Sequence, residues 1–564
     1  MRKSVMTAAM LGLMLVAPFQ SWSAVPPPEE PFAESIEVTV VNVDVVVRDR
    51  AGNLVPGLTR DDFKLFVDGK PVEISNFYAA GPPPPAAAPA APAAPEGPAA
   101  GTAGEAAAAS GAAESGRETL SLVVYVDNAN MKPFDRNRVL KQLRGFLEQT
   151  LQPGDQLLVV TDDLGLHVRH PFQRPLSALG PELDQMEKEA GLGISRENEA
   201  RQALDAIQTI RCIGGVEGIA QTHADKVYAE VKSTYADLQR LIRSLGSLSG
   251  RKVLLYVGNG VPVHAGADVF GLVAAICPED NAGGRPIDTS SPMHAVIAAA
   301  NANRVTLYAL EATGLRNYAS AETPSPLMPY DLASAVDADR QDSLTALTTG
   351  TGGRAALNAN DFSHDLQGLA SDLNGGYSLG FTPPRSGDRK THSLKVEVTR
   401  PHLRLSYREG YRELSPGERL EGRMTAALLH GFADNPLDLA LKLGTPTPAD
   451  RGKMLLPVQL SVPFGKLAML PQADGHRDRI VIFAASLDPH GEMSGINRID
   501  VPVHVPATAA PQVLANRFGY NAKLLLEPGR QRVAFVIVDQ TSHISSSVFQ
   551  DVDVDKSSAD GTRH

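Results

Sequence analysis

Short apolar runs alternate with helix-like segments through the middle of the chain. Residues 120–126 form an almost continuous apolar run, as strands buried on both faces do. Apolar residues then recur at helical spacing in 139–151, and further strand-like runs follow at 156–161, 252–257 and 305–310. Strands that alternate with helices predict a doubly wound, mostly parallel sheet with helices on both faces. We place this α/β domain at residues 118–413.

The two flanks of this domain have an all-β pattern. Residues 36–48 are rich in β-branched side chains, and Asp68-Gly69 is a hairpin signal between two strand-like runs, so we predict a small β-module over 33–80. Beyond Glu413, short strands are separated by Gly, Pro and Asp. This spacing predicts an immunoglobulin-like β-sandwich over 414–556. The fold class is therefore multidomain α/β plus all-β.

Three other segments are not expected to fold. Residues 81–117 are mainly Ala, Pro, Gly and Ser, which predicts a disordered linker, and 557–564 form a disordered tail. Arg2 and Lys3 precede an apolar run and the small residues of 21–24. This order predicts a signal peptide at 1–24, and the run is shorter than the roughly 20 residues that span a bilayer. We expect export to the periplasm, the cell surface or the medium, and no membrane span in the mature chain.

The composition limits the classes of partner that the chain can bind and the number of disulfides that it can form. A net charge of -11 and a single Trp among 564 residues argue against nucleic acid or anionic lipid as the main partner. A protein partner is expected instead. Cys212 and Cys277 are the only cysteines. An oxidising compartment permits one disulfide between them, and two unrelated thiols are the alternative.

Several motifs together resemble a known family. The runs 122–127, 250–257 and 304–310 resemble the first, central and next strands of a von Willebrand factor type A (VWA) domain. More specific are residues 372–383 and 407–411, together with Asp61-Asp62-Phe63. With these motifs the chain resembles the bacterial VWFA-related family of the type abundant in Acidobacteria. The resemblance covers residues 36–411 and implies a VWA-like domain, but that family lends no defined biochemical activity.

The resemblance also implies a place for a divalent cation. VWA domains bind Mg²⁺ or Mn²⁺ through Asp-x-Ser-x-Ser after the first strand, a Thr, and an Asp after the central strand. Asp127 is present here, whereas Ala129 and Met131 stand at the serine positions and Asn259 stands where Asp is usual. Asn130 is a third candidate ligand. We predict a degenerate metal site at Asp127, Asn130 and Asn259, at which Asp127 caps the following turn or helix; weak Mg²⁺ or Mn²⁺ binding is the alternative, and no other cofactor is expected.

The sequence is compatible with three functions. No Gly-x-Ser-x-Gly, no phosphate-binding Gly-Lys-Ser/Thr loop and no His-Glu-x-x-His motif occurs. We therefore expect an exported, non-catalytic protein-binding or scaffold protein rather than an enzyme. A metal-dependent adhesin is the first alternative, and an enzyme whose site the motifs do not reveal is the second.

Overall fold

A computed structural model describes most of the chain. The predicted signal peptide, linker and tail lie outside the described residues. Short 3-10 turns occupy Arg60–Asp62, Leu176–Ala178, Asp450–Gly452 and Phe464–Lys466. In the part of the chain that is described, no helix is both long and apolar enough to cross a membrane. The described residues are 40–80, 119–172, 174–210, 212, 214–248, 250–278, 284–316, 328–383, 389–489 and 491–554.

The central sheet has six strands in the order β12-β11-β8-β5-β6-β7. Neighbouring strands are parallel except β7, which runs antiparallel to β6. All residues of β5 are buried, as the apolar run predicts. The predicted mainly parallel sheet is therefore confirmed. The strands are β5 (Leu120–Val126), β6 (Gln156–Asp162), β7 (Leu166–His170), β8 (Arg251–Gly258), β11 (Val305–Glu311) and β12 (Ala355–Ala356).

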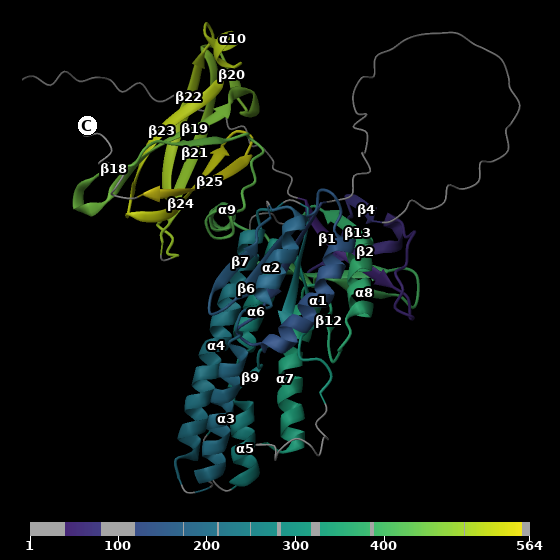
Figure 1. Cartoon of the computed structure of the whole chain (residues 1–564). Helices are drawn as coiled ribbons and strands as arrows, with labels where there is room; N and C mark the ends of the chain where they lie inside the picture. Colours follow the sequence, from purple (N-terminus) through teal and green to yellow (C-terminus); the bar gives the residue numbers. More distant parts are fainter. Residues whose placement is uncertain are drawn as a thin grey trace, which may run out of the picture. The chain divides into compact units, whose positions relative to one another are not determined.

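Helices cover both faces of this sheet (Figure 1). One face packs against α1 (Pro133–Thr150), α2 (Leu179–Met186) and α8 (Ser363–Asn374). The other face packs against α4 (Val216–Leu245), α6 (Ser290–Asn303) and α7 (Tyr330–Thr349). Each helix buries one apolar stripe, so two cores lie back to back across the sheet.

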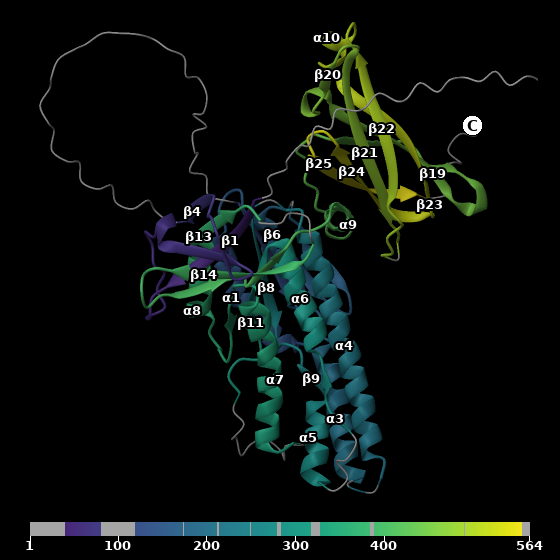
Figure 2. The ribbon, with the colours of Figure 1, turned by 180° about the vertical axis from the view of Figure 1, so that it is seen from behind.

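Several helices continue past the ends of the strands, and we call this part the helical extension. It comprises α3 (Gly193–Ile210), the first half of α4, α5 (Ala267–Ile276) and the start of α7 (Figures 1 and 2). The extension has a core of its own, which includes Leu204, Val269 and Phe270. Cys212 and Cys277 form a disulfide there, with Cα atoms 5.5 Å apart. Two short strands, β9 (His264–Ala265) and β10 (Ile287–Asp288), pair at its base.

The β-module predicted at 33–80 does not stand alone. Its strands β1 (Val41–Arg48), β2 (Phe63–Val67), β3 (Lys70–Val72) and β4 (Asn76–Ala80) pair with β13 (Gly376–Phe381), β14 (Thr391–Val398), β15 (Arg404–Tyr407) and β16 (Gly410–Arg412). Two four-stranded sheets result, in the orders β15-β1-β13-β4 and β16-β14-β2-β3. They enclose one core, because strands from both ends contribute apolar faces. The strands β13 to β16 therefore belong to this module and not to the central sheet. We had predicted the opposite, because they fall within the α/β domain placed at 118–413.

The C-terminal region is antiparallel β, as predicted, but it begins with a helix that the strand prediction omits. α9 (Pro416–His430) starts at a capping box in which Ser415 and Glu418 bond each other's backbone nitrogens. Met424 and Leu428 of α9 pack on one face of β24, and the other face of β24 lines the main core. The remaining elements are β17 (Ala440–Leu443), β18 (Thr447–Pro448), β19 (Met454–Pro463), β20 (Leu470–Gln472), β21 (Gly475–Leu487), β22 (Asn497–Pro506), α10 (Ala510–Val513), β23 (Arg517–Leu526), β24 (Gly529–Asp539) and β25 (Ser545–Val554).

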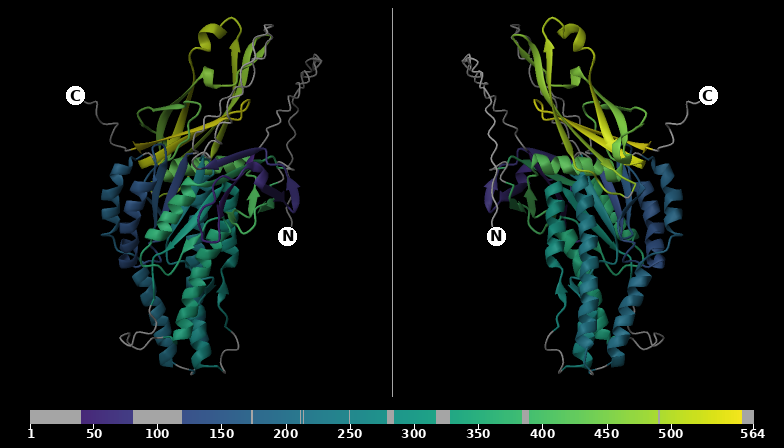
Figure 3. Two further views of the ribbon diagram at one scale, coloured as in Figure 1. Left: turned by 90° about the vertical axis from the view of Figure 1, so that its right-hand side faces the viewer. Right: turned by 90° about the vertical axis from the view of Figure 1, so that its left-hand side faces the viewer.

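Strand pairing divides this region into two sheets. One joins β17, β18 and β23 to β19, and the other has the order β20-β21-β24-β25 with β22 also paired to β21. The strand β19 alternates buried and partly exposed residues along its length, as a strand with one face on a core does. Figure 3 shows the strands of this region from two sides.

Candidate functional site

Three predicted site residues converge at the carboxyl edge of the central sheet. Asp127 follows β5 and Asn259 follows β8, and parallel neighbours end at the same edge. The amide nitrogen of Asn130 donates to Asp127 Oδ1 at 2.9 Å and to Oδ2 at 2.8 Å. The backbone carbonyl of Asn130 in turn accepts from Asn259 Nδ2 at 3.2 Å. The three residues therefore lie next to one another at this edge, where Asn130 contacts the Asp127 side chain and Asn259 contacts the Asn130 backbone.

Two tyrosines complete this centre, and the sequence analysis missed both. Tyr256 donates its hydroxyl to Asp127 Oδ2, and Tyr125 donates to Asp162 Oδ2 at 2.6 Å. The two rings stack with centroids 5.3 Å apart. Both tyrosines lie inside apolar strand runs, where a tyrosine is normally interpreted as core. The only sequence signal is that each carries a hydroxyl that must find a partner when buried.

Burial sets the electrostatics of Asp127. The residue is fully buried. Burial raises the pKa of its carboxyl to about 6, and the nearby charge of Asp162 adds to this, whereas the hydrogen bonds from Tyr256 and Asn130 oppose it. The hydrogen bonds from Tyr256 and Asn130 and the charge of Arg196 thus favour the carboxylate form against the cost of burial.

The residues at this centre do not fit Mg²⁺ or Mn²⁺. A cation needs oxygen ligands, but Asn130 turns its amide nitrogen toward Asp127 and its Oδ1 accepts from Arg196. Asn259 likewise presents nitrogen to the Asn130 carbonyl. Ala129 and Met131 are buried and have no oxygen in their side chains. Across the described ranges, no group of three or more His, Cys, Asp or Glu residues is arranged to hold a metal.

Asp127 instead stabilises the turn that follows β5. Its Oδ1 accepts from the backbone nitrogen of Asn130 at 3.2 Å. The helix α1 begins later, with Lys132 at the N-cap position, so Asp127 caps the turn and not the helix. Asp163 follows β6 at the same edge of the sheet, but its carboxylate pairs with Arg169 at 3.1 Å.

A cavity of about 730 Å³ adjoins this centre. It lies between the carboxyl edge of the sheet and the helical extension, and Asn130, Arg196 and Asn259 form part of its wall. Most charged groups of the wall are paired with each other. These pairs include Lys132 with Glu197 at 2.6 Å, Arg196 with Glu230 at 3.3 Å, His264 with Asp339 at 2.6 Å and His223 with Asp268 at 3.4 Å.

Large apolar side chains are exposed around the same edge. The exposed fractions are 76% for Phe134, 70% for Leu164, 48% for Ile194 and 65% for Leu315. Phe134 lies in the first turn of α1 and Ile194 at the start of α3, whereas Leu164 and Leu315 lie in the loops after β6 and β11. We call these four residues the apolar rim. The sequence alone does not predict this surface, because it does not tell which apolar side chains are exposed.

Close backbone contacts hold the parts of the apolar rim together. A Cβ atom at Gly193 would lie 2.4 Å from the carbonyl oxygen of Met131, so only glycine lets the start of α3 approach the loop after β5 this closely. Arg138, one helical turn after Phe134, donates to the carbonyl of Ala312 in the loop that carries Leu315. These contacts hold together the start of α1, the start of α3 and the loop after β11, which carry three of the four rim residues.

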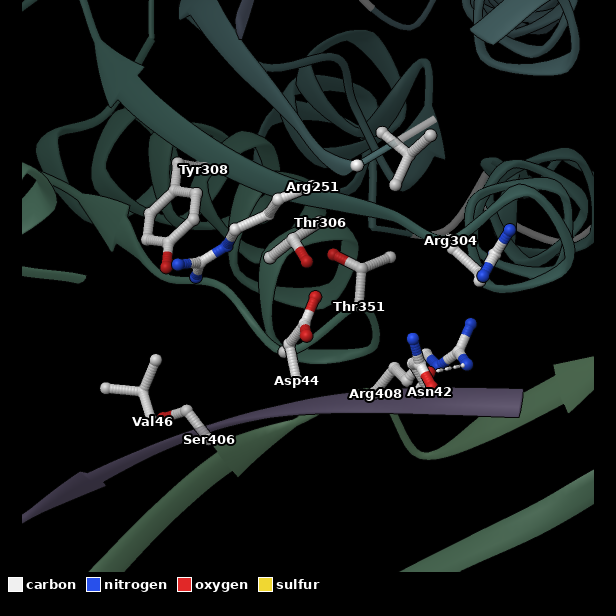
Figure 4. A pocket seen from close by; sticks show the side chains of 13 residues that line it. Asn42, Asp44, Val46, Arg251, Arg304, Thr306, Tyr308, Thr351, Ser406 and Arg408 are labelled. Carbon is white, nitrogen blue, oxygen red and sulfur yellow. Dashed lines mark hydrogen bonds between the residues drawn. The ribbon is translucent and has the colours of Figure 1, made fainter. Parts of the chain in front are cut away.

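A second, much smaller cavity lies at the opposite edge of the sheet. Its volume of about 30 Å³ corresponds to one water molecule. Asp44 points toward Thr306 and Thr351 across it (Figure 4). The buried Arg408 beside it donates to the carbonyl of Asn301 at 3.0 Å and to that of Asn42. These contacts join β1 and β15 to the α/β layer, and the cavity is too small for an organic ligand.

Comparisons with known proteins give no family. No protein-family model and no curated protein matches the chain. Among solved structures, an aerotolerance-related membrane protein of Bacteroides fragilis is 7% identical, with a TM-score of 0.21 over 45% of this chain and 98% of that one. BatB of Bacteroides thetaiotaomicron is 7% identical, with a TM-score of 0.19 over 45% and 97% of the two chains. The pilus adhesin SpaC of Lactobacillus rhamnosus GG is 8% identical, with a TM-score of 0.23 over 77% and 53%. All three TM-scores lie below 0.5 and carry no argument about fold or function.

Proposed function

We propose that this chain is an exported, non-catalytic binding protein that docks a protein partner through the carboxyl edge of its central, VWA-like sheet. The apolar rim is the observation that carries the proposal. Several exposed apolar side chains at one edge of a domain are typical of a protein interface, and an aromatic side chain such as Phe134 is a common anchor. The C-terminal region, which we interpret as an immunoglobulin-like sandwich, is a spacer or second contact in this scheme.

The hydrogen bonds of Asp127 support docking without a metal. In a metal-dependent adhesin the carboxylate would ligate a cation whose open position accepts the partner. Here Asn130 and Tyr256 take up both carboxylate oxygens. No observation among the described residues favours the adhesin or enzyme alternatives over docking by the rim.

A site-specific photo-crosslink tests the docking surface. A photo-reactive phenylalanine analogue placed at position 134 or 315 is expected to crosslink the same exported protein in cells of the source organism. The matched control is position 470, where Leu470 is 52% exposed on β20 of the C-terminal region. Mass spectrometry of the adducts identifies the partner.

The outcomes separate the alternatives. Adducts at 134 and 315 that are missing at 470, and that Phe134→Asp abolishes at position 315 without lowering Tm, support the proposal. Equal labelling at all three positions, or labelling that Phe134→Asp leaves unchanged, contradicts it. Labelling that requires added Mg²⁺ would favour the adhesin.

A further inference from the structure

The cavity beside Asp127 has the size and lining of a ligand site. Its volume of about 730 Å³ lies within the range of 300–1,000 Å³ that is typical of small-molecule sites. Apolar side chains from the extension, including Leu204, Val231 and Val336, line part of it. The remainder is polar and charged. The docking function proposed above does not use this interior, because none of the four rim residues lines the cavity.

Two buried polar atoms in the wall have no hydrogen-bond partner among the described residues, Arg316 Nε and Asn259 Oδ1. Asn259 Oδ1 is the acceptor of the two. Asn259 is 8% exposed, and its Oδ1 accepts no hydrogen bond from any described residue. Its Nδ2 donates to the Asn130 carbonyl, which fixes the orientation of the amide and leaves Oδ1 as the free acceptor. A buried acceptor without a donor costs about 1–3 kcal/mol, so a ligand N–H at this point would be stabilised.

Two charged groups of the wall also lack an ion-pair partner within the described ranges. Asp135, in the first turn of α1, forms no ion pair or hydrogen bond through its carboxylate with a described residue, although the charges of Arg138, Lys132 and Arg316 act on it. Arg340 of α7 forms none through its guanidinium, and its charge acts on Asp337 and Asp268. The other acidic and basic side chains of the wall are paired as described above or as Lys226 with Glu199 and Arg316 with Asp337. The cavity thus offers one carboxylate and one guanidinium that have no direct ion-pair partner among the described residues.

These free groups discriminate between classes of ligand. A phosphorylated ligand needs several unpaired cations, and Arg340 is the only free one in the described wall. A divalent cation needs convergent oxygen ligands, which the pairing of the acidic side chains removes. A ligand with one carboxylate, one ammonium group and N–H donors between them matches Arg340, Asp135 and Asn259 Oδ1, and a short peptide has this chemistry.

We propose that this cavity binds a short peptide with free termini, whose carboxylate pairs with Arg340, whose ammonium group pairs with Asp135 and whose backbone N–H donates to Asn259 Oδ1. The apolar part of the wall receives a side chain of the peptide. Asp135, Arg340 and Asn259 come from α1, α7 and the loop after β8, so the peptide lies between the sheet and the helical extension.

Calorimetric titration of the full chain with alanyl-leucyl-alanine tests the site. The free tripeptide is expected to bind, and its N-acetylated and C-amidated forms are each expected to bind roughly tenfold more weakly, because each loses one charged contact. Asp135→Asn should remove the preference for the free amine only. Arg340→Gln should remove the preference for the free carboxylate only.

Matched variants control for changes in overall charge. Glu199→Gln and Arg201→Gln alter wall residues that already have partners, and they are expected to keep both preferences. The proposal is overturned if the free tripeptide does not bind at millimolar concentration, if blocked peptides bind equally, or if the controls act like the test variants. Crosslinking at Phe134 is measured separately, so failure of peptide binding leaves the docking proposal standing, and the reverse also holds.

Discussion

Asp127 carries a buried charge that is held by hydrogen bonds from uncharged groups. Its oxygens accept from the Asn130 amide, the Asn130 backbone and the Tyr256 hydroxyl, and the charge of Arg196 lies farther away. Burial without a paired cation disfavours the charged form, so this residue costs stability at neutral pH. The centre keeps its shape because each donor is itself anchored, Tyr256 on β8 and Asn130 on a capped turn.

The pH dependence of stability follows from this charge. The pKa of Asp127 is raised from 3.8 to about 6 in the folded state, so the folded protein binds the proton more tightly and becomes more stable as the pH falls through 6. From pH 7 to pH 4.5 the contribution is about 2 kcal/mol. Urea unfolding of the wild type and of Asp127→Asn at both pH values measures it. Asp127→Asn should lack this gain, and identical pH profiles would contradict the assignment.

Metal titration tests whether the centre at Asp127 binds a divalent cation. Millimolar Mg²⁺ or Mn²⁺ is expected to leave Tm unchanged, because a cation would have to displace the Asn130 amide and the Tyr256 hydroxyl. A functional site saturated a hundredfold would add about 2.7 kcal/mol. Thermal unfolding with and without metal decides, and a rise in Tm that disappears in Asp127→Ala would show that the centre binds the cation after all.

Part of this centre could be predicted from the sequence. Asp127 follows β5 and Asn259 follows β8. Because these two strands are parallel neighbours, both residues lie at the same edge of the sheet. The direction of the Asn130 amide and the reach of Arg196 from α3 could not be predicted, because they depend on side-chain packing across 66 residues of chain.

At the scale of elements, the periodicities identified most strands and helices but not all of their partners. β5, β6, β8 and β11 lie where apolar runs predicted a parallel sheet. β1 pairs with β13 and β15, which are more than 300 residues away in the chain, and antiparallel pairing at that distance leaves no local signal. The boundary predicted at 118 therefore divides strands that share one core.

Arg408 links β1 to α6 through two hydrogen bonds, and we expect its replacement to lower the stability of the fold. Arg408→Gln removes the donors to the carbonyls of Asn301 and Asn42 in a buried site, and this should lower the free energy of unfolding by about 2–3 kcal/mol. Arg404→Gln, at an exposed position of β15, should change it by less than about 0.5 kcal/mol. Chemical unfolding followed by circular dichroism compares them, and equal effects would contradict the role of Arg408.

At the scale of the whole molecule, the helical extension is stabilised separately from the sheet. It has its own core, and its disulfide joins the end of α3 to the end of α5. A structural disulfide is typical of exported proteins, so this bond supports the proposal that the chain works outside the cytoplasm. The two cysteines could be identified from sequence, but whether they pair depends on the placement of α3 and α5.

Removal of the disulfide should loosen the extension and leave the sheet intact. The bond closes a loop of 65 residues, which corresponds to about 4 kcal/mol of lost chain entropy in the unfolded state. Cys212→Ala, at an exposed position, removes the bond with little loss of packing. Hydrogen exchange should then rise in α3 and α5 and stay constant in β5 and β8, because these strands belong to different cores. The wild type in the presence of a reductant should give the same pattern. Faster exchange in β5 and β8 as well would mean that the extension and the sheet unfold as one unit, and unchanged exchange everywhere would mean that the bond contributes nothing to stability.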